Sequence, residues 1–348
     1  MSTTERYARP VEETTWEIPS EFGTVFRWEY EEAREPLLRL YEKGKNLQWN
    51  TNTRLDWSIE VDPGSPENAP YYYIPIYGSD IYEKMTDKER RELRHHMSAW
   101  TNSQFLHGEQ GALICASKIV PAVPDIDCKF YAATQVMDEA RHVETYKRLL
   151  HDKFELAYPI TPTLKRLLND VLSDSRWDMT YLGMQVLIEG LALAAFATIR
   201  DQAKNTLAAA VNAYVMQDEA RHVAFGRLAL RDYYPELTQP ERDEREEFAV
   251  EACYLMRDRF LSEEVWETLG LPVEECVGYV ESSQLMREFR SMLFSRIVPT
   301  IKDIGLWGPK IRRAYANMGI LGFAEIDTQA LAENDERVAE EFDARRGA

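Results

Sequence analysis

The pentapeptide Asp-Glu-Ala-Arg-His occurs twice in this chain, at residues 138–142 and 218–222. On an α-helix, residues three positions apart lie one above the other on the same face, so the glutamate and the histidine of each copy project side by side. A carboxylate and an imidazole placed in this way can bind one metal ion. The repeat therefore predicts two metal-binding pairs on two helices. These residues are Glu139 and His142 in the first copy and Glu219 and His222 in the second.

Two further carboxylates, Glu109 and Glu189, each lie thirty residues before the glutamate of a repeat. The midpoint of the first interval is Pro124, in a proline turn, and that of the second is Lys204, in the polar segment RDQAKN. Each interval is therefore expected to be a helical hairpin, which returns the chain to the level at which it started. The six side chains are expected to meet in one layer of a helical bundle.

The surroundings of Glu189 indicate what compensates its charge. It stands in the apolar sequence MQVLIEGLALAAFATI, where an unpaired carboxylate would be costly. Two divalent ions would neutralise four carboxylates, so metal binding and folding are expected to be coupled. An oxygen-rich site with only two imidazoles favours two iron ions, or manganese in one or both positions, over structural zinc.

A third Glu-x-x-His, from Glu92 to His95, lies in the charged segment DKERRELRHH and has no repeat partner. It is expected to lie on a solvated helix face and not to bind metal. A structural network of ion pairs is the alternative for the two DEARH copies themselves. The matching upstream carboxylates favour the dimetal site.

The composition excludes several classes of protein. With 41 Lys and Arg against 59 Asp and Glu, the net charge is −18, and the basic residues form no stripe, so nucleic acid is not an expected partner. The four cysteines occur singly, which fits a reducing cytoplasm. The N-terminal segment is unlike a signal peptide, and the most apolar stretch, 190–199, is shorter than the roughly 18 residues of a membrane span. A cytoplasmic protein without a membrane partner is expected.

The spacing of apolar residues predicts an all-α protein. Residues 1–86 are rich in Pro, Tyr and Trp and predict an irregular N-terminal arm packed on the core. Helical periodicity then predicts a bundle with the dimetal site over 87–235, additional helices of the same domain over 236–320, and a charged tail, helical or disordered, over 321–348. The helices are expected at about 86–120, 127–154, 163–173, 175–201, 205–233, 239–269, 281–303 and 309–318.

Three sets of residues carry a resemblance to a known family: LYEKGKNLQWNTNTRLDWSIEVD at 40–62, LHGEQ at 106–110, and the two DEARH copies. They resemble the ribonucleotide-reductase-like branch of the ferritin-like superfamily, which includes reductase small subunits, ligand-binding oxidases and hydroxylase subunits of bacterial multicomponent monooxygenases. The likeness covers roughly residues 35–235, and the DEARH spelling is closest to the hydroxylases. It implies a ferritin-like four-helix bundle in which the six side chains above bind the metal ions.

The resemblance also implies roles for the other residues of the repeats. Asp138 and Asp218 are expected to accept hydrogen bonds from the histidines of the opposite copy, which fixes the imidazole tautomer. Arg141 and Arg221 would then pair with acidic neighbours. The alternative for both arginines is an ordinary position on a helix surface.

Tyr146 stands one helical turn after His142, where reductase small subunits carry their radical tyrosine. Its alternative role is packing. The chain after residue 322 contains no tyrosine, although the small subunits need one there for radical transfer. A ribonucleotide reductase is therefore not favoured.

Other positions depart from the relatives. The valine and tyrosine that ligand-binding oxidases crosslink are Gly111 and Met184 here, so that crosslink cannot form. Leu193 replaces a threonine that monooxygenase hydroxylases typically carry, and Val215 replaces the additional histidine of arylamine N-oxygenases. A seventh metal ligand is not expected.

Together these features predict a non-haem di-iron oxidase or oxygenase that uses dioxygen to oxidise a small organic substrate by hydroxylation, N-oxygenation or desaturation. The chain has no dinucleotide fingerprint and no cysteine cluster, so an external reductase or ferredoxin is expected to supply electrons. The alternatives are a radical-generating subunit and a non-enzymatic iron-storage protein. The resemblance implies a homodimer. The candidate walls of a substrate pocket are Gly111, Ala112, Tyr146, Leu193 and Gly226.

Overall fold

Helices make up the regular structure of the chain, as the sequence predicts. The computed structural model describes residues 6–11, 14–21, 23–27, 30, 34–67 and 74–347. Within these residues the only β contact is an isolated bridge between Tyr7 and Ala157. The predicted all-α class is therefore confirmed.

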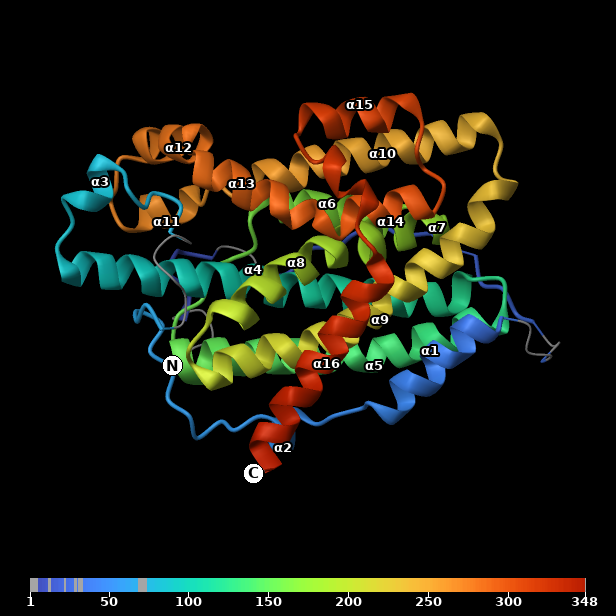
Figure 1. Cartoon of the computed structure of the whole chain (residues 1–348), viewed down its shortest axis with the longest axis horizontal. Coiled ribbons are helices and arrows are strands. Elements are labelled where there is room, and N and C mark those ends of the chain that lie inside the picture. Colours follow the sequence, from blue (N-terminus) through green and yellow to red (C-terminus); the bar gives the residue numbers. More distant parts are fainter. Residues whose placement is uncertain are drawn as a thin grey trace.

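Four long helical runs form the central bundle (Figure 1). They are α4 (Asp87–Ala122), α5 (Ile126–Arg148), the run from α7 (Trp177–Tyr181) to α8 (Glu189–Gln202), and α9 (Thr206–Tyr233). Helix α4 packs on α5, and α8 packs on α9. The short connections at 123–125 and 203–205 are the two predicted hairpin turns, so both hairpins are confirmed.

Side-chain caps fix where these helices begin. The hydroxyl of Thr86 accepts a hydrogen bond from the backbone N–H of Glu89, whose carboxylate accepts one from the N–H of Thr86. Asp125 caps α5 by accepting from the N–H of Cys128, and Asn205 caps α9. These caps set the level in the bundle at which the later side chains of each helix lie.

Two π-helical turns interrupt the regular geometry, at Leu149–Phe154 after α5 and at Leu182–Ile188 between α7 and α8. The sequence predicts a continuous α-helix over 175–201, and its periodicity does not reveal the wider turn. Such turns are rare and occur frequently at functional sites. The second one ends immediately before Glu189, so it determines the direction in which that carboxylate leaves the helix.

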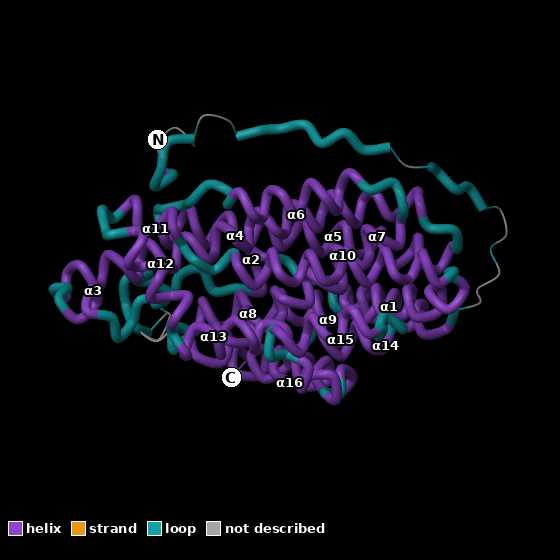
Figure 2. The backbone as a smooth tube through the Cα atoms, turned by 90° about the horizontal axis from the view of Figure 1, so that it is seen from above, coloured by secondary structure: helices purple, strands orange, loops and turns teal. Residues whose placement is uncertain are grey.

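The arm that the sequence predicts to be irregular contains three helices within its described residues: α1 (Glu35–Asn46), α2 (Thr51–Arg54) and α3 (Asp80–Glu83). Helix α1 packs on α5. The described residues before α1 are extended along one side of the body (Figure 2). There Nε1 of Trp16 donates a hydrogen bond of 2.9 Å to Asn169 of α6 (Pro162–Ser173).

The helices that follow the bundle are shorter than predicted. The expected helix over 239–269 ends at Asp258, because the chain turns at Ser262, whose φ of +54° is left-handed and ends a helix. The expected helix over 281–303 is also divided. The helices of this part, which lie along one side of the bundle (Figure 1), are α10 (Gln239–Asp258), α11 (Glu263–Thr268), α12 (Val273–Ser282), α13 (Gln284–Met292), α14 (Ile297–Asp303) and α15 (Pro309–Asn317).

The charged tail is a helix, α16 (Thr328–Gly347), that crosses α9 (Figure 1). One face of this helix is not solvated, because two of its own residues, Asp335 and Ala339, are buried. Asp335 lies 3.1 Å from Nη1 of Arg200 and 2.8 Å from Nη1 of Arg296. Buried ion pairs therefore fix the tail to the bundle.

The run Trp177–Gln202 is long and apolar enough to cross a membrane by composition alone. In the fold, 72% of its most apolar window is buried inside the protein. A core helix of a globular protein has the same properties, and the run packs on α9 in the bundle.

Candidate metal centre

Four helices bring the six predicted side chains together in the centre of the bundle. All six are buried, and the most exposed, Glu109, is only 6% accessible. Their ligand atoms form two groups, in each of which the atoms lie within 4.8 Å of one another. The first group is Glu109, Glu139, His142 and Glu219, and the second is Glu139, Glu189, Glu219 and His222. This arrangement offers two adjacent cation positions that share the carboxylates of Glu139 and Glu219.

The two histidines direct their Nδ1 atoms at carboxylates of this cluster. Nδ1 of His142 lies 2.9 Å from Oε1 of Glu219, and Nδ1 of His222 lies 3.1 Å from Oε1 of Glu139. Each imidazole therefore approaches a carboxylate of the other repeat. Nδ1 is the nitrogen that is positioned to bind a cation.

The Nε2 atoms contact aspartates of the opposite repeat. Nε2 of His142 lies 3.0 Å from Oδ2 of Asp218, and Nε2 of His222 lies 3.2 Å from Oδ2 of Asp138. A proton on Nε2 is donated to the aspartate, which keeps the Nδ1 lone pair available to a metal. The cross-pairing has the arrangement that the resemblance implies.

Both arginines of the repeats are buried in ion pairs and are not surface residues. Arg141 contacts Asp138 at 2.5 Å and Asp218 at 2.7 Å, and Arg221 bonds Asp218 as well. Nε1 of Trp49 donates a further bond of 2.8 Å to Asp218. Burial opposes ionisation of Asp218, but Arg221 and the other donors hold its pKa well below the usual value. The aspartate is therefore a permanent anion that orients His142.

Several buried oxygens of the cluster have no hydrogen-bond partner within the described part of the chain. They are Oε2 of Glu139, Oε2 of Glu189 and both carboxylate oxygens of Glu219. Buried carboxylate oxygens without partners are costly, and cations would satisfy them. Four carboxylates with two imidazoles suit iron or manganese. The residues present therefore fit a dimetal site.

The electrostatics of the cluster show how it behaves without cations. Burial, followed by the negative charge of Glu219, raises the pKa of Glu109 to about 8. The same two causes raise the pKa of Glu189 well above its usual value. Burial opposes the charging of His142, but its hydrogen bonds to Asp218 and Glu109 raise its pKa well above the usual value. Without cations the cluster holds protons, which metal ions would displace.

Two buried glutamines that the sequence analysis missed support the carboxylates. Nε2 of Gln135 donates to Oε1 of Glu139 at 3.0 Å and to Oε1 of Glu189 at 3.1 Å. Nε2 of Gln185 lies 3.4 Å from Oε1 of Gln135. Gln135 stands one helical turn before Glu139, a spacing that could have indicated it. Gln185 lies in the π-helical turn and has no comparable signal.

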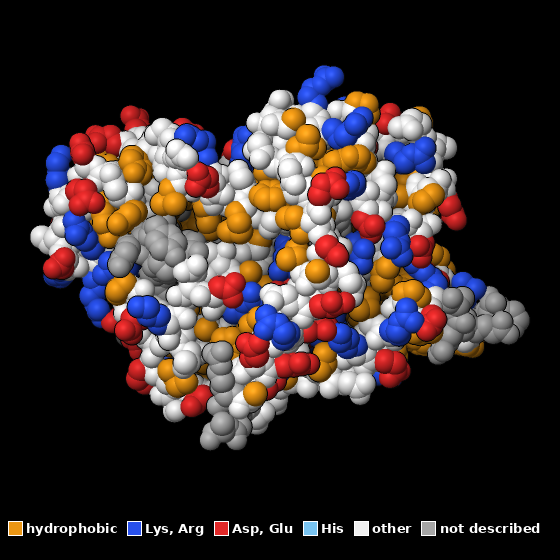
Figure 3. Space-filling model, in the orientation of Figure 1, with side chains coloured by type: hydrophobic (Ala, Val, Ile, Leu, Met, Phe, Trp, Pro, Cys, Tyr) orange, Lys and Arg blue, Asp and Glu red, His pale blue; other side chains and the backbone are white. Residues whose placement is uncertain are grey.

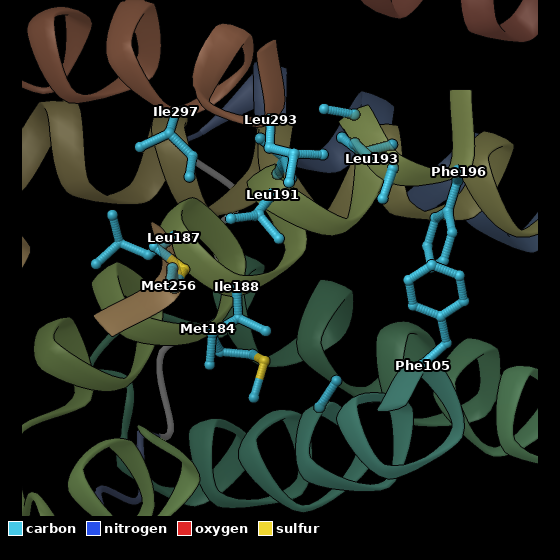
Figure 4. Close-up of a cluster of buried hydrophobic side chains, with 14 of the residues drawn as sticks. Phe105, Met184, Leu187, Ile188, Leu191, Leu193, Phe196, Met256, Leu293 and Ile297 are labelled. Atoms are coloured by element: carbon cyan, nitrogen blue, oxygen red, sulfur yellow. The ribbon is translucent and has the colours of Figure 1, made fainter. Parts of the chain in front are cut away.

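A cavity of about 160 Å³ adjoins the cluster, and Glu109, Glu189 and Glu219 form part of its wall. Its apolar wall includes Phe105, Ala112, Met184, Ile188, Leu191 and Phe196. Phe105 of α4 and Phe196 of α8 meet edge to face with their ring centroids 4.7 Å apart (Figure 4). The cavity is therefore largely apolar beside the carboxylates.

Of the five predicted wall residues, Ala112 lines this cavity. Gly111 instead packs against α6, Gly226 packs against the π-helical turn, and Leu193 lines a second cavity of about 40 Å³ beneath α16. Tyr146 lies behind the wall, with its ring stacked on Phe196. The prediction of Gly111, Leu193 and Gly226 as walls is wrong, because proximity to a ligand along a helix does not determine which neighbouring helix a residue faces.

The third Glu-x-x-His contributes nothing to the cluster. Glu92 is exposed, and Nε2 of His95 lies 2.9 Å from the carbonyl oxygen of Phe154. Val215 is fully buried on α9 and offers no ligand atom, so the position at which arylamine N-oxygenases carry a histidine is apolar here.

A family model described as p-aminobenzoate N-oxygenase AurF matches residues 30–305. The matched range contains the whole cluster and most of the chain. The chain belongs to the AurF family. An AurF-family protein with this cluster is a dimetal, dioxygen-dependent oxidoreductase that oxidises a small substrate, so the predicted enzyme class is confirmed. No curated protein matches the sequence.

Solved structures share the fold of this AurF-family chain. An R2-like ligand-binding oxidase variant with an anaerobically reconstituted Mn/Fe cofactor matches with a TM-score of 0.51 at 18% identity, over 78% of this chain and 94% of that chain. The dimanganese(II) NrdF of Streptococcus sanguinis matches with a TM-score of 0.50 at 12% identity, over 85% of this chain and 99% of that chain. These matches confirm the predicted ferritin-like fold.

Proposed function

We propose that Glu109, Glu139, His142, Glu189, Glu219 and His222 bind two iron ions and that the protein uses them to insert oxygen from dioxygen into a small substrate held in the adjoining cavity. The observation that carries this proposal is that Glu139 and Glu219 belong to both groups of ligand atoms. These two carboxylates would hold the two ions next to each other. When bound and reduced, the iron pair supplies the electrons that activate dioxygen.

The surrounding side chains prepare the site for this chemistry. Asp218 and Asp138 hold a proton at Nε2 of the two histidines and so direct the Nδ1 lone pairs inward. Gln135 orients two of the carboxylates through its amide protons. The apolar wall, with Phe105 and Phe196, limits the access of water to the reaction.

N-oxygenation is the reaction to test first, because it is the activity for which the family is named. Hydroxylation and desaturation are the other outcomes of the same assay. The radical-generating alternative is less well supported, because the Tyr146 hydroxyl donates to Asn212 at 3.2 Å rather than to a cluster carboxylate. The storage alternative does not account for a cavity that ends at the cluster.

The protein is proposed to need an external electron donor, to be cytoplasmic and to form a homodimer. Among the described residues all four cysteines are free and buried, so an external reductase or ferredoxin supplies the electrons. Free cysteines also fit a cytoplasmic protein. The oligomer expected by resemblance is a homodimer.

An anaerobic ferrous titration followed by oxygen addition tests the proposal. Full occupancy at two ferrous ions per chain and a coupled diferric Mössbauer signal after oxygenation are expected. Product analysis with an aromatic amine and a chemical reductant then distinguishes nitrogen oxidation from carbon oxidation. Saturation at one ion per chain would contradict the shared-carboxylate site.

A further inference from the structure

The cavity beside the cluster carries opposite charges at different places. Its charged lining residues are Glu109, Glu189 and Glu219, which belong to the cluster, and Arg94 and Arg259. The glutamates are buried, whereas both arginines are half-buried, so the arginines lie on the side nearer to solvent. Along α4, the lining side chains between Arg94 and Glu109 include the apolar Met97, Trp100 and Phe105. The cavity therefore fits a molecule with an anionic group at only one of its two ends.

Arg259 has no acidic partner in the described part of the chain. It follows the last residue of α10, and its only described interaction is with the ring of Phe260, 5.2 Å from the guanidinium carbon. Burial alone lowers the pKa of this side chain to about 10. By contrast, the buried Arg221 contacts Asp218, and the buried Arg245 contacts Asp178 at 3.0 Å. An unpaired guanidinium in a cavity is a place where an anion is stabilised.

Arg94 adds a second cation to the lining of the cavity. Its Nε donates to the carbonyl oxygen of Gly64 at 2.8 Å, which fixes the side chain but leaves both terminal nitrogens free of any acid among the described residues. The chain carries a net charge of −18, so acidic partners are abundant elsewhere. Two arginines without a described acidic partner therefore line one cavity.

Ser262, three residues after Arg259, has an unusual backbone conformation. Ser262 lines it with a left-handed φ of +54°, which is uncommon for a residue other than glycine and is found at functional sites. The nearby acid Glu264 accepts a hydrogen bond of 3.2 Å from Nε1 of Trp100, another lining residue, and forms no ion pair with either arginine. Hydrophobic side chains are also visible on the face that carries α8 and α13 (Figure 3).

Helix α4 sets the spacing between two of the residues that line the cavity. Arg94 and Glu109 are fifteen residues apart on this one helix, which corresponds to about 22 Å along its axis. A molecule that reaches from the arginines to the cluster must therefore be long compared with a single aromatic ring. Because a guanidinium binds a carboxylate through parallel N–H bonds, and a doubly charged phosphate would lose more hydration in an apolar cavity, a carboxylate fits best.

We infer that Arg94 and Arg259 form a carboxylate-binding site at the outer end of the cavity, and that the substrate is an elongated, mainly apolar carboxylic acid whose opposite end is oxidised at the cluster. The second part rests on the proposed function. The first part does not, because the arginines bind the carboxylate whether or not metal is present.

Binding of decanoate, decan-1-ol and 4-aminobenzoate to the full-length protein tests the inference. Quenching of tryptophan fluorescence reports occupancy, since Trp100 lines the cavity. The titrations are done without added metal and again after loading with Mn(II) under argon. Decanoate is expected to bind more tightly than the other two probes in both states. Arg259→Met is expected to weaken decanoate binding roughly ten- to a hundredfold while leaving decan-1-ol binding unchanged.

Two further variants control this comparison. Arg259→Lys keeps the charge and is expected to retain part of the decanoate affinity. Arg257→Met removes an arginine that pairs with Asp258 and does not line the cavity, so it should bind decanoate like the wild type.

Equal affinity for decanoate and decan-1-ol, or no effect of Arg259→Met, would overturn the carboxylate site. Tighter binding of 4-aminobenzoate than of decanoate would overturn the elongated substrate. Failure to bind metal would contradict only the proposed function.

Discussion

His142 reaches across the bundle to Asp218, with Nε2 of the imidazole 3.0 Å from Oδ2 of the carboxylate, and His222 makes the reciprocal contact with Asp138 at 3.2 Å. Each copy of the repeat therefore provides the proton acceptor for the imidazole of the other copy. The two halves cannot form their metal positions independently. A change in one half should affect a ligand that belongs to the other.

Asp218→Asn tests this dependence. The substitution keeps the shape of the side chain but removes the charge that orients His142, so the affinity for metal should fall by roughly ten- to a hundredfold. Competition with a chelator, using Mn(II) as the probe, measures the change. Asp170→Asn, at an exposed position on α6, is the control and should bind like the wild type. An unchanged affinity in Asp218→Asn would show that the contact does not support the ligand.

The shared carboxylates should determine how many metal ions each chain binds. Glu219 belongs to both groups of ligand atoms, whereas Glu109 belongs to one. Glu219→Ala should therefore lose both metal ions, and Glu109→Ala should keep about one of the two. Metal analysis after gel filtration gives the numbers. Glu92→Gln alters the Glu-x-x-His that lies outside the cluster and should keep both ions. Equal losses in the two alanine variants would contradict the sharing.

Metal binding should release protons. The pKa of Glu109, raised to about 8, means that its carboxyl group is mainly protonated at pH 7 in the metal-free protein. A metal ion needs the ionised form, so binding at pH 7 displaces a proton and the affinity should rise as the pH increases from 6 to 8. A pH indicator in weakly buffered solution detects the release when Mn(II) is added without oxygen. Binding without a pH change would argue against a protonated cluster.

The sequence predicts the cluster well because its residues are placed by spacing along single helices and by the turns between neighbouring helices. The i, i+3 spacing places Glu139 beside His142, and the turn residues at the midpoints place Glu109 and Glu189 at the same level. The cavity walls depend on contacts between helices, which are not local. Leu193 is four residues after Glu189, which rotates it by about 40° around the helix axis, and it faces the second cavity.

The same distinction explains the errors in the C-terminal helices. The helix breaks where Ser262 adopts a left-handed conformation. This conformation is typical of glycine, so a serine at this position does not mark the break in the sequence. The docking of α16 depends on Asp335, which is indistinguishable in the sequence from the exposed acids around it. The π-helical turn before Glu189 is equally invisible, because an extra residue per turn hardly alters an apolar pattern that is buried on every side.

Gly226 is required by packing and not by the cavity. A Cβ atom at this position would lie 2.6 Å from Cβ of Gln185, an atom too close to the backbone to move easily. Gly226→Ala should therefore destabilise the protein by about 1–3 kcal/mol, and it should also weaken metal binding by displacing the amide that contacts Gln135. Gly278→Ala, at an exposed helical position with open space, should instead stabilise the protein by roughly 0.5–1 kcal/mol. Urea denaturation compares the two variants, and equal effects would contradict the close contact.

Buried ion pairs attach α16 to the bundle. Asp335 is fully buried between Arg200 and Arg296, which are themselves 4% and 11% exposed. Removing one partner of a buried ion pair leaves an uncompensated charge, so Asp335→Asn should cost about 3–5 kcal/mol in the free energy of unfolding or should release the helix from α9. Urea denaturation measures the first outcome, and faster cleavage after Thr328 in limited proteolysis detects the second. Glu340→Gln, an exposed change on the same helix, should alter neither. If both measurements match the wild type, the buried pairs do not hold the tail in place.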